Sequence, residues 1–260
     1  LGFIFGPPLG GIVKHRFGIE YVGYVVAGLC LLNLIMAYFL LPESLKEKKT
    51  TVKFQLNLIE EFSTVLTKPL VKEIFWFGLV YVVAFAMMQT TLALMWKTHY
   101  GMTDEQNSYA FAFMGLMAAV VQGGMIGWLN RTFGEKQLLV FGTLIFIIGL
   151  VLLPLVPKNL FVPVELFAIA LVALANGCLT PTLLSILSKN TPDHEQGQVL
   201  GLNQSFNSLA RAIGPTIAGA LYDFHYFMPY MAGAALMLIC WYLAVWIGKE
   251  VKLATSEPIT

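Results

Sequence analysis

The chain has 260 residues, of which 57% are hydrophobic and only 12% are charged, and its formal net charge is +1. Soluble domains carry about 25% charged residues, so this composition excludes an ordinary water-exposed surface and predicts an all-α membrane protein. The small net charge also excludes a basic face for nucleic acid.

Apolar runs follow one another along most of the sequence. A bilayer core about 30 Å thick is crossed by about 20 mostly apolar residues in a helix. Runs of that kind predict a partial helix and then a series of complete membrane-spanning helices. The partial helix covers residues 1–13, and the complete ones cover 20–41, 74–96, 106–129, 138–156, 160–187, 198–222 and 228–248. Most connections are short, which makes successive helices antiparallel.

The connection over residues 42–73 is the exception to this pattern. Its first part, ESLKEKKTTVK, is polar. Apolar residues then recur at helical spacing, at Leu58, Ile59, Phe62, Val65 and Leu66. This spacing favours a helix that lies on the membrane surface, and a flexible linker is the alternative.

Basic residues gather on one side of the predicted helices. That side holds Lys46, Lys48, Lys49, Lys53, Lys68, Lys72, Arg131, Lys136, Lys189, Lys249 and Lys252, and the other holds Lys14, Arg16, Lys97 and Lys158. Cytoplasmic loops of membrane proteins carry the excess of Lys and Arg. We therefore expect a multi-pass protein of the cell (inner) membrane, with the long connection and the C-terminus in the cytoplasm.

A motif of glycine and proline occurs twice in the chain. Residues 2–11 read GFIFGPPLGG, and residues 214–219 read GPTIAG. Closely spaced glycines let helix backbones approach, and a proline permits a bend. Repeated multi-helix halves are typical of secondary transporters, although ordinary helix packing also explains such a motif. The packing or gating residues predicted here are Gly6, Pro7, Gly10, Gly11, Gly214 and Pro215.

These motifs resemble the major facilitator superfamily from its fifth helix to its twelfth. The pattern Gly2-x3-Gly6-Pro7-x2-Gly10-Gly11 resembles the end of the fifth-helix motif of drug/proton antiporters. Residues 127–136, GWLNRTFGEK, resemble the signature loop between helices eight and nine, which adds Gly127, Arg131 and Gly134 to the predicted gating residues. Asn130 stands where an Asp is common, so any gating ion pair there lacks one charge. Residues 41–44, LPES, resemble the usual end of the sixth helix.

The resemblance implies a major facilitator-type helical bundle from which about four N-terminal helices are missing. Residues 1–41 would be the last two helices of the N-terminal half, and residues 42–73 the cytoplasmic central loop with its amphipathic helix. Residues 74–248 would be the six-helix C-terminal half, followed by a cytoplasmic tail over 249–260. The missing N-terminal helices would then be partners of the chain. The helix at 138–156 would be peripheral, which predicts that leucine at Gly142 or Gly149 harms activity less than leucine at Gly6, Gly10 or Gly214.

By the same resemblance, the seventh and tenth helices would line a substrate cavity. Met87 and Met88 would add adaptable apolar surface to it. The candidate substrate-binding residues on these helices are Tyr81, Gln89, Trp96, Asn176 and Thr180. Hydrogen bonding between helices is the alternative role for each of them. Glu165, near the start of the tenth helix, is a candidate proton carrier, or a carboxylate favoured there by the helix dipole and within reach of the headgroups.

A polar stripe marks the eleventh helix. Asn203, Asn207 and Arg211 follow one another at intervals of four residues and therefore share one face. An arginine within a membrane span is costly and usually marks a transport pathway or a paired partner. Asn207 and Arg211 are therefore added to the predicted substrate-binding residues, with backbone carbonyls as the alternative partner of Arg211.

The function that best fits these features is proton-coupled export of small amphipathic molecules by alternating access. A sugar or metabolite facilitator or symporter is the alternative within transport, and a non-transporting membrane receptor is the alternative outside it. We expect no enzymatic activity and no cofactor, because neither a catalytic triad nor a metal-ligand spacing occurs. Cys30, Cys178 and Cys240 lie within apolar runs and are predicted to be packing residues.

Overall fold

The computed structural model describes residues 2–41, 69–157, 160–192 and 195–256. Within these ranges the chain is helical apart from short turns, which confirms the predicted all-α fold. The predicted surface helix of the 42–73 connection lies almost entirely outside the described residues, and residues 69–73 belong to the helix that follows.

The helices follow the predicted spans closely. They are α1 (Gly2–Phe17), α2 (Ile19–Leu40), α4 (Pro69–Thr98), α5 (Asp104–Val120), α6 (Ile126–Leu152), α7 (Phe161–Lys189), α8 (Gln196–Phe224) and α9 (Met228–Ser256). A π-helical turn, η1 (Val121–Met125), joins α5 to α6, and a 3-10 turn, η2 (Leu153–Leu155), follows α6. The last helix continues to Ser256, beyond its predicted end at residue 248.

Several helices are long and apolar enough to cross a membrane. They are Ile19–Leu40, Leu70–Thr98, Phe161–Lys189, Met228–Ile247 and the run Asp104–Leu155. That run has 52 residues, enough for two crossings of a bilayer. Helix α8 has 29 residues but is not among them, because the stripe of polar residues lowers its hydropathy.

Gly134 divides the Asp104–Leu155 run into two antiparallel helices. Its backbone φ of 77° and ψ of 160° interrupt the regular helix of α6. Residues that carry a side chain rarely adopt a positive φ, so glycine is the residue that permits this reversal. The break falls between the predicted helices 106–129 and 138–156 and gives Gly134, one of the predicted gating residues, a defined structural role.

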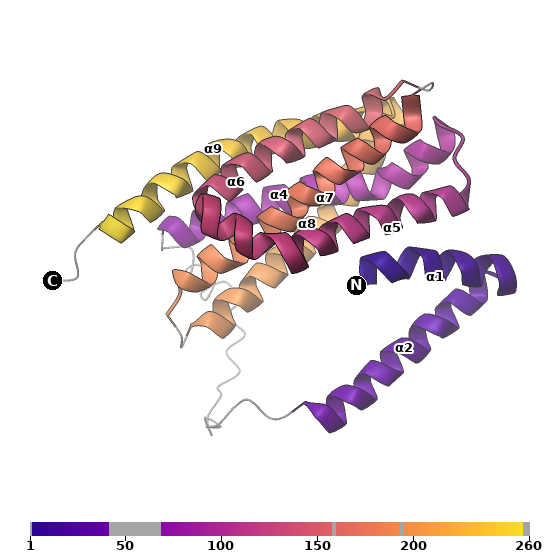
Figure 1. Cartoon of the computed structure of the whole chain (residues 1–260), viewed down its shortest axis with the longest axis horizontal. Coiled ribbons are helices and arrows are strands. Elements are labelled where there is room, and N and C mark those ends of the chain that lie inside the picture. The colour runs from indigo at the N-terminus through magenta and orange to yellow at the C-terminus, as the bar shows by residue number, and fades with distance from the viewer. Residues whose placement is uncertain (1, 42–68, 158–159, 193–194, 257–260) are drawn as a thin grey trace.

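Helices α4 to α9 form one bundle around a continuous apolar core (Figure 1). Helix α4 packs against α8 and α9, whereas α6 packs against α7 and α9. Fully buried aromatic side chains fill the centre, among them Phe75, Phe77, Trp96, Phe146 and Tyr230. Because lipid is as apolar as leucine, such helices associate mainly through close van der Waals contact. Positions where backbones approach closely therefore decide the arrangement.

The expectation that side chains at Gly142 and Gly149 do less harm than at Gly6, Gly10 or Gly214 does not fit the packing. A Cβ at Gly149 would lie 2.7 Å from Cγ2 of Val172, and one at Gly142 would lie 3.0 Å from Cδ2 of Leu179. Both neighbours belong to α7. The second part of α6 therefore packs against α7 as closely as any pair of helices in the bundle, and a helix can be peripheral to a cavity and still be tightly packed.

Gly214 marks the close approach of α8 to α4. A Cβ there would lie 2.7 Å from Cβ of Ala86 and 3.1 Å from the carbonyl oxygen of Val83. Gly219 belongs to the same glycine-proline motif, yet no other helix of the described structure comes within 4 Å of its Cβ position. Gly214, the first glycine of this motif, is therefore the one that the packing of the bundle requires.

We expect Gly214→Ala to destabilise the purified chain, because added volume in a packed interior costs about 1–3 kcal/mol. Thermal unfolding followed by circular dichroism in detergent measures this change. Gly219→Ala is the matched control and should leave the unfolding midpoint unchanged or raise it slightly, since alanine favours a helix over glycine. Equal midpoints for the two variants would show that α8 does not approach α4 closely at Gly214.

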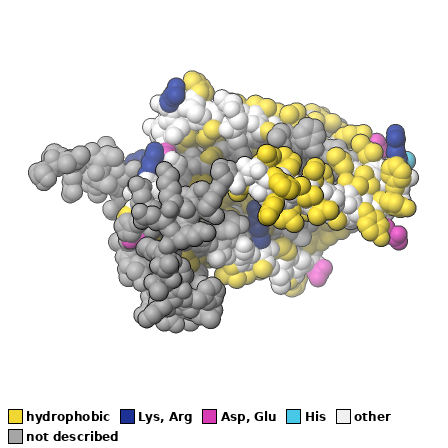
Figure 2. All heavy atoms as spheres, turned by 90° about the horizontal axis from the view of Figure 1, so that it is seen from below, with side chains coloured by type: hydrophobic (Ala, Val, Ile, Leu, Met, Phe, Trp, Pro, Cys, Tyr) yellow, Lys and Arg dark blue, Asp and Glu magenta, His cyan; other side chains and the backbone are white. Residues whose placement is uncertain are grey.

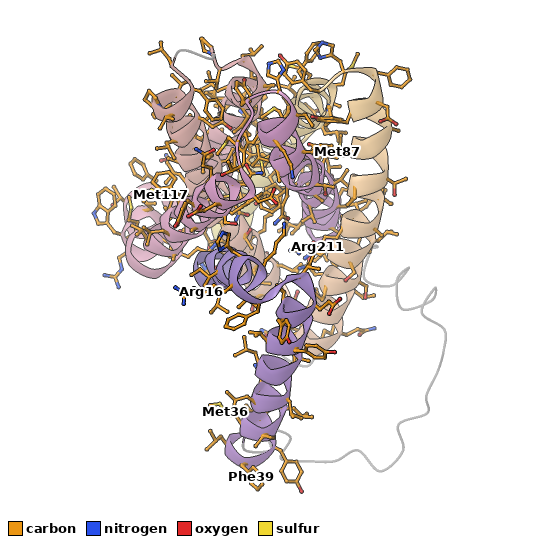
Figure 3. All side chains as sticks on the ribbon, turned by 90° about the vertical axis from the view of Figure 1, so that its right-hand side faces the viewer. Arg16, Met36, Phe39, Met87, Met117 and Arg211 are labelled. Atoms are coloured by element: carbon orange, nitrogen blue, oxygen red, sulfur yellow. The ribbon has the colours of Figure 1, made fainter. Side chains whose placement is uncertain are left out.

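Helices α1 and α2 are arranged differently from the bundle. Helix α1 contacts α5, whereas α2 leads away from the other helices (Figure 1) and has no buried residue. Met36 and Phe39 lie at its far end, well clear of the bundle (Figure 3). Apolar side chains spread over one end of the face seen in Figure 2, and charged side chains stand at the outer edge of that end. Such a surface suits lipid or further membrane helices.

Candidate functional site

A polar cluster joins α4 to α7 inside the bundle. The Tyr81 hydroxyl donates a hydrogen bond to Oδ1 of Asn176 and lies 3.4 Å from Oγ1 of Thr180. Thr180 also donates to Asn176, at 3.2 Å. Tyr81 is buried, whereas Thr180 is exposed, so the cluster reaches from the core to an open face of α7. The structure thus brings together three of the predicted substrate residues, through the interhelical hydrogen bonds expected as their alternative role.

Arg211 lies on α8 near this cluster. Its charge is close enough to act on the Tyr81 hydroxyl. The side chain is exposed, and no carboxylate of the described residues forms an ion pair with it. In the view of Figure 3, Arg211 extends from α8 toward the middle of the molecule rather than outward. An unpaired guanidinium beside a cluster of hydrogen-bonding groups can bind an anionic or carbonyl group.

Two other predicted substrate-binding residues, Asn207 on α8 and Gln89 on α4, are half-buried. Asn207 lies one turn before Arg211, and Gln89 lies two turns after Tyr81. Asn203, at the start of the stripe, has its Oδ1 3.8 Å from the Cβ position of Gly78 in α4. The stripe therefore lies along the edge of the α4–α8 contact.

The expected methionine surface is absent from this face of the described structure. Met87 and Met88 are fully buried. Met87 packs with Val83, Ala210 and Ala218 between α4 and α8, and Met88 belongs to the main core. The prediction that these side chains offer adaptable surface to a ligand is wrong for this conformation, because α8 and the core cover them.

Trp96 lies elsewhere, near the opposite end of α4 from Pro69. It is fully buried and donates a hydrogen bond through Nε1 to Oε1 of Glu165 in α7. Its ring also lies against Phe111 of α5, with 5.3 Å between ring centroids. The structure thus pairs two residues that the sequence suggested for separate roles.

Glu135, which was not predicted as a functional residue, links the segment around Gly134 to α7. Glu135 accepts hydrogen bonds from Oγ of Ser185 at 2.5 Å and from Nζ of Lys189 at 2.7 Å. Arg131 is exposed, and no heavy atom lies within 4 Å of the Cβ position of Gly127. The signal in the sequence was a carboxylate directly after a glycine that reverses the chain.

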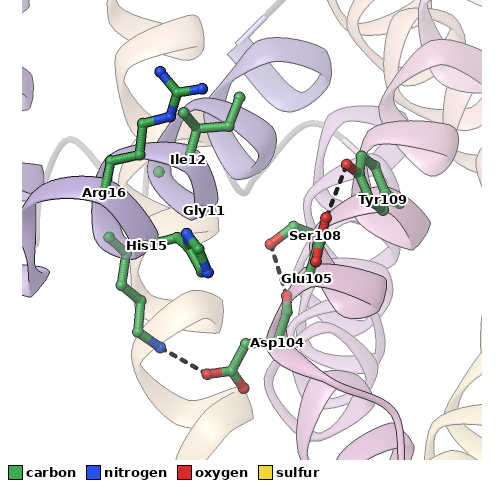
Figure 4. A pocket seen from close by; sticks show the side chains of 10 residues that line it. Gly11, Ile12, His15, Arg16, Asp104, Glu105, Ser108 and Tyr109 are labelled. Atoms are coloured by element: carbon green, nitrogen blue, oxygen red, sulfur yellow. Dashed lines mark hydrogen bonds and ion pairs between the residues drawn. The ribbon is translucent and has the colours of Figure 1, made fainter.

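Helix α1 meets α5 at the end of the bundle that contains Asp104, here called the Asp104 end. A Cβ at Gly11 would lie 3.1 Å from Oγ of Ser108. Asp104 forms an ion pair with Nζ of Lys14 at 2.7 Å (Figure 4) and a second one with Nζ of Lys97 at 2.9 Å. These pairs are exposed and add little stability, but they fix which end of α1 contacts α5. Neither Asp104 nor Ser108 was predicted, because Lys14 and Gly11, which they contact, lie far away in the sequence.

A cavity of about 490 Å³ opens between α1 and α5 beside these contacts. Side chains of both signs line it, among them Lys14, Arg16, Asp104 and Glu105 (Figure 4). Gly10, the other glycine of this part of α1, has only Cγ1 of Val22 at 4.0 Å from its Cβ position. Gly6, one turn earlier, has no neighbour within 4 Å. Among these three glycines, Gly11 is therefore the one that closely approaches α5.

Comparison with known proteins identifies the family. The sequence profile described as Major Facilitator Superfamily matches residues 1–159 and 125–258, which together cover nearly the whole chain. The chain belongs to the Major Facilitator Superfamily. Its resemblance to that superfamily, inferred from the glycine motifs and the signature loop, is confirmed.

Relatives within the superfamily include proteins named for drug resistance. The chain is 26% identical to Multidrug resistance protein 2 of Bacillus subtilis (strain 168) over 250 residues, which are 92% of this chain and 59% of the relative. It is 29% identical to Quinolone resistance protein NorA of Staphylococcus aureus (strain MRSA252), over 89% of this chain and 58% of that protein. Solute carrier family 22 member 18 of Rattus norvegicus is 26% identical over 85% of the chain and 54% of its own length.

The Major Facilitator Superfamily is a family of multi-pass membrane transporters for small molecules and not of enzymes. The chain spans a little over half the length of the relatives that it matches. The activity of the whole protein, its cargo and its orientation therefore belong to the proposal that follows.

Proposed function

We propose that the chain is the C-terminal part of an exporter that exchanges small amphipathic molecules for protons by alternating access. In this proposal α1 and α2 are the fifth and sixth helices, and α4 to α9 form the C-terminal half of the transporter. The names of the bacterial relatives, which refer to multidrug, tetracycline and quinolone resistance, support export of such molecules. Arg211 and the polar cluster around Tyr81 would bind the cargo. Gln89 and Asn207 would lie beside them.

The observation that carries this proposal is the contact between α1 and α5 at the Asp104 end. The halves of an alternating-access carrier close at one end of a central site while the other end stays open. Here the contact includes the close approach at Gly11 and the Lys14–Asp104 ion pair, which hold α1 against α5 at this end. The excess of Lys and Arg supports an orientation in which the end of the bundle that contains Gly134 faces the cytoplasm. On that orientation the closed Asp104 end faces outward.

A sugar or metabolite symporter is the second candidate, and one observation favours it. The burial of Met87 and Met88 leaves Tyr81, Asn176 and Thr180 as the residues that approach the open face of α7. Hydroxyl and amide groups recognise polar solutes by hydrogen bonding better than they recognise apolar drugs. The two candidates therefore differ in the chemistry of their cargo, which is amphipathic in the first and polar in the second.

Ethidium, an amphipathic cation, provides the test. We expect the full-length protein in liposomes to drive ethidium across the membrane when a pH gradient is imposed, because proton movement down the gradient supplies the energy. Ethidium fluorescence measures the flux, and a protonophore should abolish it. Liposomes without protein are the control. Saturable uptake of a radiolabelled sugar, without any ethidium flux, would overturn drug export in favour of the second candidate.

A further inference from the structure

Glu165 is a carboxyl group buried inside the bundle. It lies near the start of α7 and is 3% exposed. Its Oε1 accepts the hydrogen bond from Nε1 of Trp96, whereas Oε2 has no hydrogen-bond partner among the described residues. A buried carboxyl oxygen without a partner is unusual, because most buried polar atoms are hydrogen-bonded.

The groups that face Glu165 offer no positive charge to compensate an ionised carboxylate. The titratable groups close enough to interact with it are the phenols of Tyr100, between α4 and α5, and of Tyr230 in α9. From α5 comes the apolar ring of Phe111, behind Trp96. The end of α6 and η2, residues 146–156, is entirely apolar. In the described structure no lysine, arginine or histidine forms an ion pair with Glu165.

An ionised carboxylate in this place would be unstable. Moving such a group out of water costs several kcal/mol even after relaxation, unless a cation and further hydrogen bonds compensate it. One indole N–H is the only such bond in the described structure. Binding a proton removes the charge, and the carbonyl oxygen of the neutral acid can still accept the hydrogen bond from Trp96.

We propose that Glu165 is the proton-binding site of this transporter and that it carries its proton in the described conformation. The proposal rests on proton-coupled transport as the function. A proton is the ligand that fits here, because Trp96 and Tyr230 are fully buried around the carboxyl group, and a larger cation would need a cavity. When the bundle opens and water reaches the carboxyl group, the O–H bond breaks, the proton leaves to water and the carboxylate remains.

A series of titratable groups leads from Glu165 to the Asp104 end. Tyr100 interacts with Glu165 and with Tyr226, and the ring of Tyr226 stacks on His99 with 4.0 Å between centroids. His225 also contacts Tyr226, at 4.6 Å. Both histidines lie just outside the helix ends. On the proposed orientation, protons from outside the cell enter at this end, which is the direction that an exporter requires.

Infrared spectroscopy of the purified full-length protein tests proton binding without any cargo. Difference spectra between acidic and alkaline pH should contain the C=O stretching band of a buried protonated carboxyl group, and Glu165→Gln should remove that band. Glu105→Gln, at the exposed start of α5, is the matched control and should retain it. Trp96→Phe keeps an aromatic ring but loses the N–H donor, so the band should persist at a shifted frequency.

An unchanged band in Glu165→Gln would overturn the proposal, as would an unshifted band in Trp96→Phe. The second variant keeps the test decisive if the first fails to fold. Transport separates this proposal from the function on which it rests. Glu165→Gln should lose ethidium flux driven by a pH gradient but retain ethidium exchange without a gradient, whereas Glu105→Gln retains both. If the parental protein moves no ethidium, drug export fails, and the infrared result still decides the role of Glu165.

Discussion

A disulfide bond between cysteines placed at Gly11 and Ser108 is expected to abolish transport by the full-length protein, and a reducing agent should restore it. A Cβ at position 11 would lie 3.5 Å from Cβ of Ser108. Disulfides join Cβ atoms about 3.5–4.5 Å apart, so the bond should form in the described conformation. Once formed, it holds α1 against α5, and the Asp104 end cannot open. Alternating access requires that opening in every cycle.

The control pair places cysteines at Gly6 and Ser108. No heavy atom lies within 4 Å of the Cβ position of Gly6, so this pair should not cross-link and should transport normally before and after oxidation. Both pairs need a background in which the native cysteines Cys30, Cys178 and Cys240 are replaced. Loss of free thiols, counted by maleimide labelling, measures the cross-link. Full cross-linking of the Gly11–Ser108 pair with undiminished flux would show that this contact does not open during transport.

The helices were predictable because their signal is local. An apolar run of about 20 residues contains all of its own backbone hydrogen bonds, so the spans at 74–96 and 160–187 needed no knowledge of their neighbours. The break between the helices at 106–129 and 138–156 was predicted from polarity, and Gly134 supplies its geometry. The last predicted span, 228–248, agrees with the apolar segment Met228–Ile247, and α9 continues beyond it through a charged segment.

Which face of each helix meets a neighbour was not predictable. An apolar side chain is equally stable against lipid and against another helix, so hydrophobicity does not distinguish the two environments in a membrane. Gly142 and Gly149 were therefore assigned to a loosely packed helix, and Met87 and Met88 to an open cavity. The contacts with Leu179, Val172 and α8 arise only when the bundle is assembled.

The candidate site was predictable in its parts and not in its connections. Asn176 and Thr180 lie one helical turn apart, so their common face follows from the sequence. Their hydrogen bond to Tyr81 spans 95 residues and does not. The hydrogen bond between Trp96 and Glu165 was not predictable for the same reason, because the two residues are far apart in the sequence. Each of them had been predicted as a candidate for a separate role. Polar residues in apolar helices thus identify candidates, and packing decides their partners.

Arg211→Gln is expected to abolish flux in the full-length protein, and Arg211→Lys to retain part of it. An arginine at the centre of a membrane helix costs about 2.5–3.5 kcal/mol on insertion scales, which a functional partner would offset. Arg211 lies near the middle of α8, too far from either end for its side chain to extend to the headgroups. Lysine keeps the charge but loses the planar fork of the guanidinium, whereas glutamine loses the charge.

Flux per molecule in the membrane is the measurement for this pair, so that a change in expression is not mistaken for a change in transport. Arg16→Gln removes the same charge from the end of α1 and is the matched control. We expect it to transport nearly normally, because Arg16 is exposed and lies at a helix end. Parental flux in both Arg211 variants would contradict a role in transport. Loss of the Gln variant from the membrane, with normal flux per remaining molecule, would make Arg211 a folding residue that pairs with backbone carbonyls.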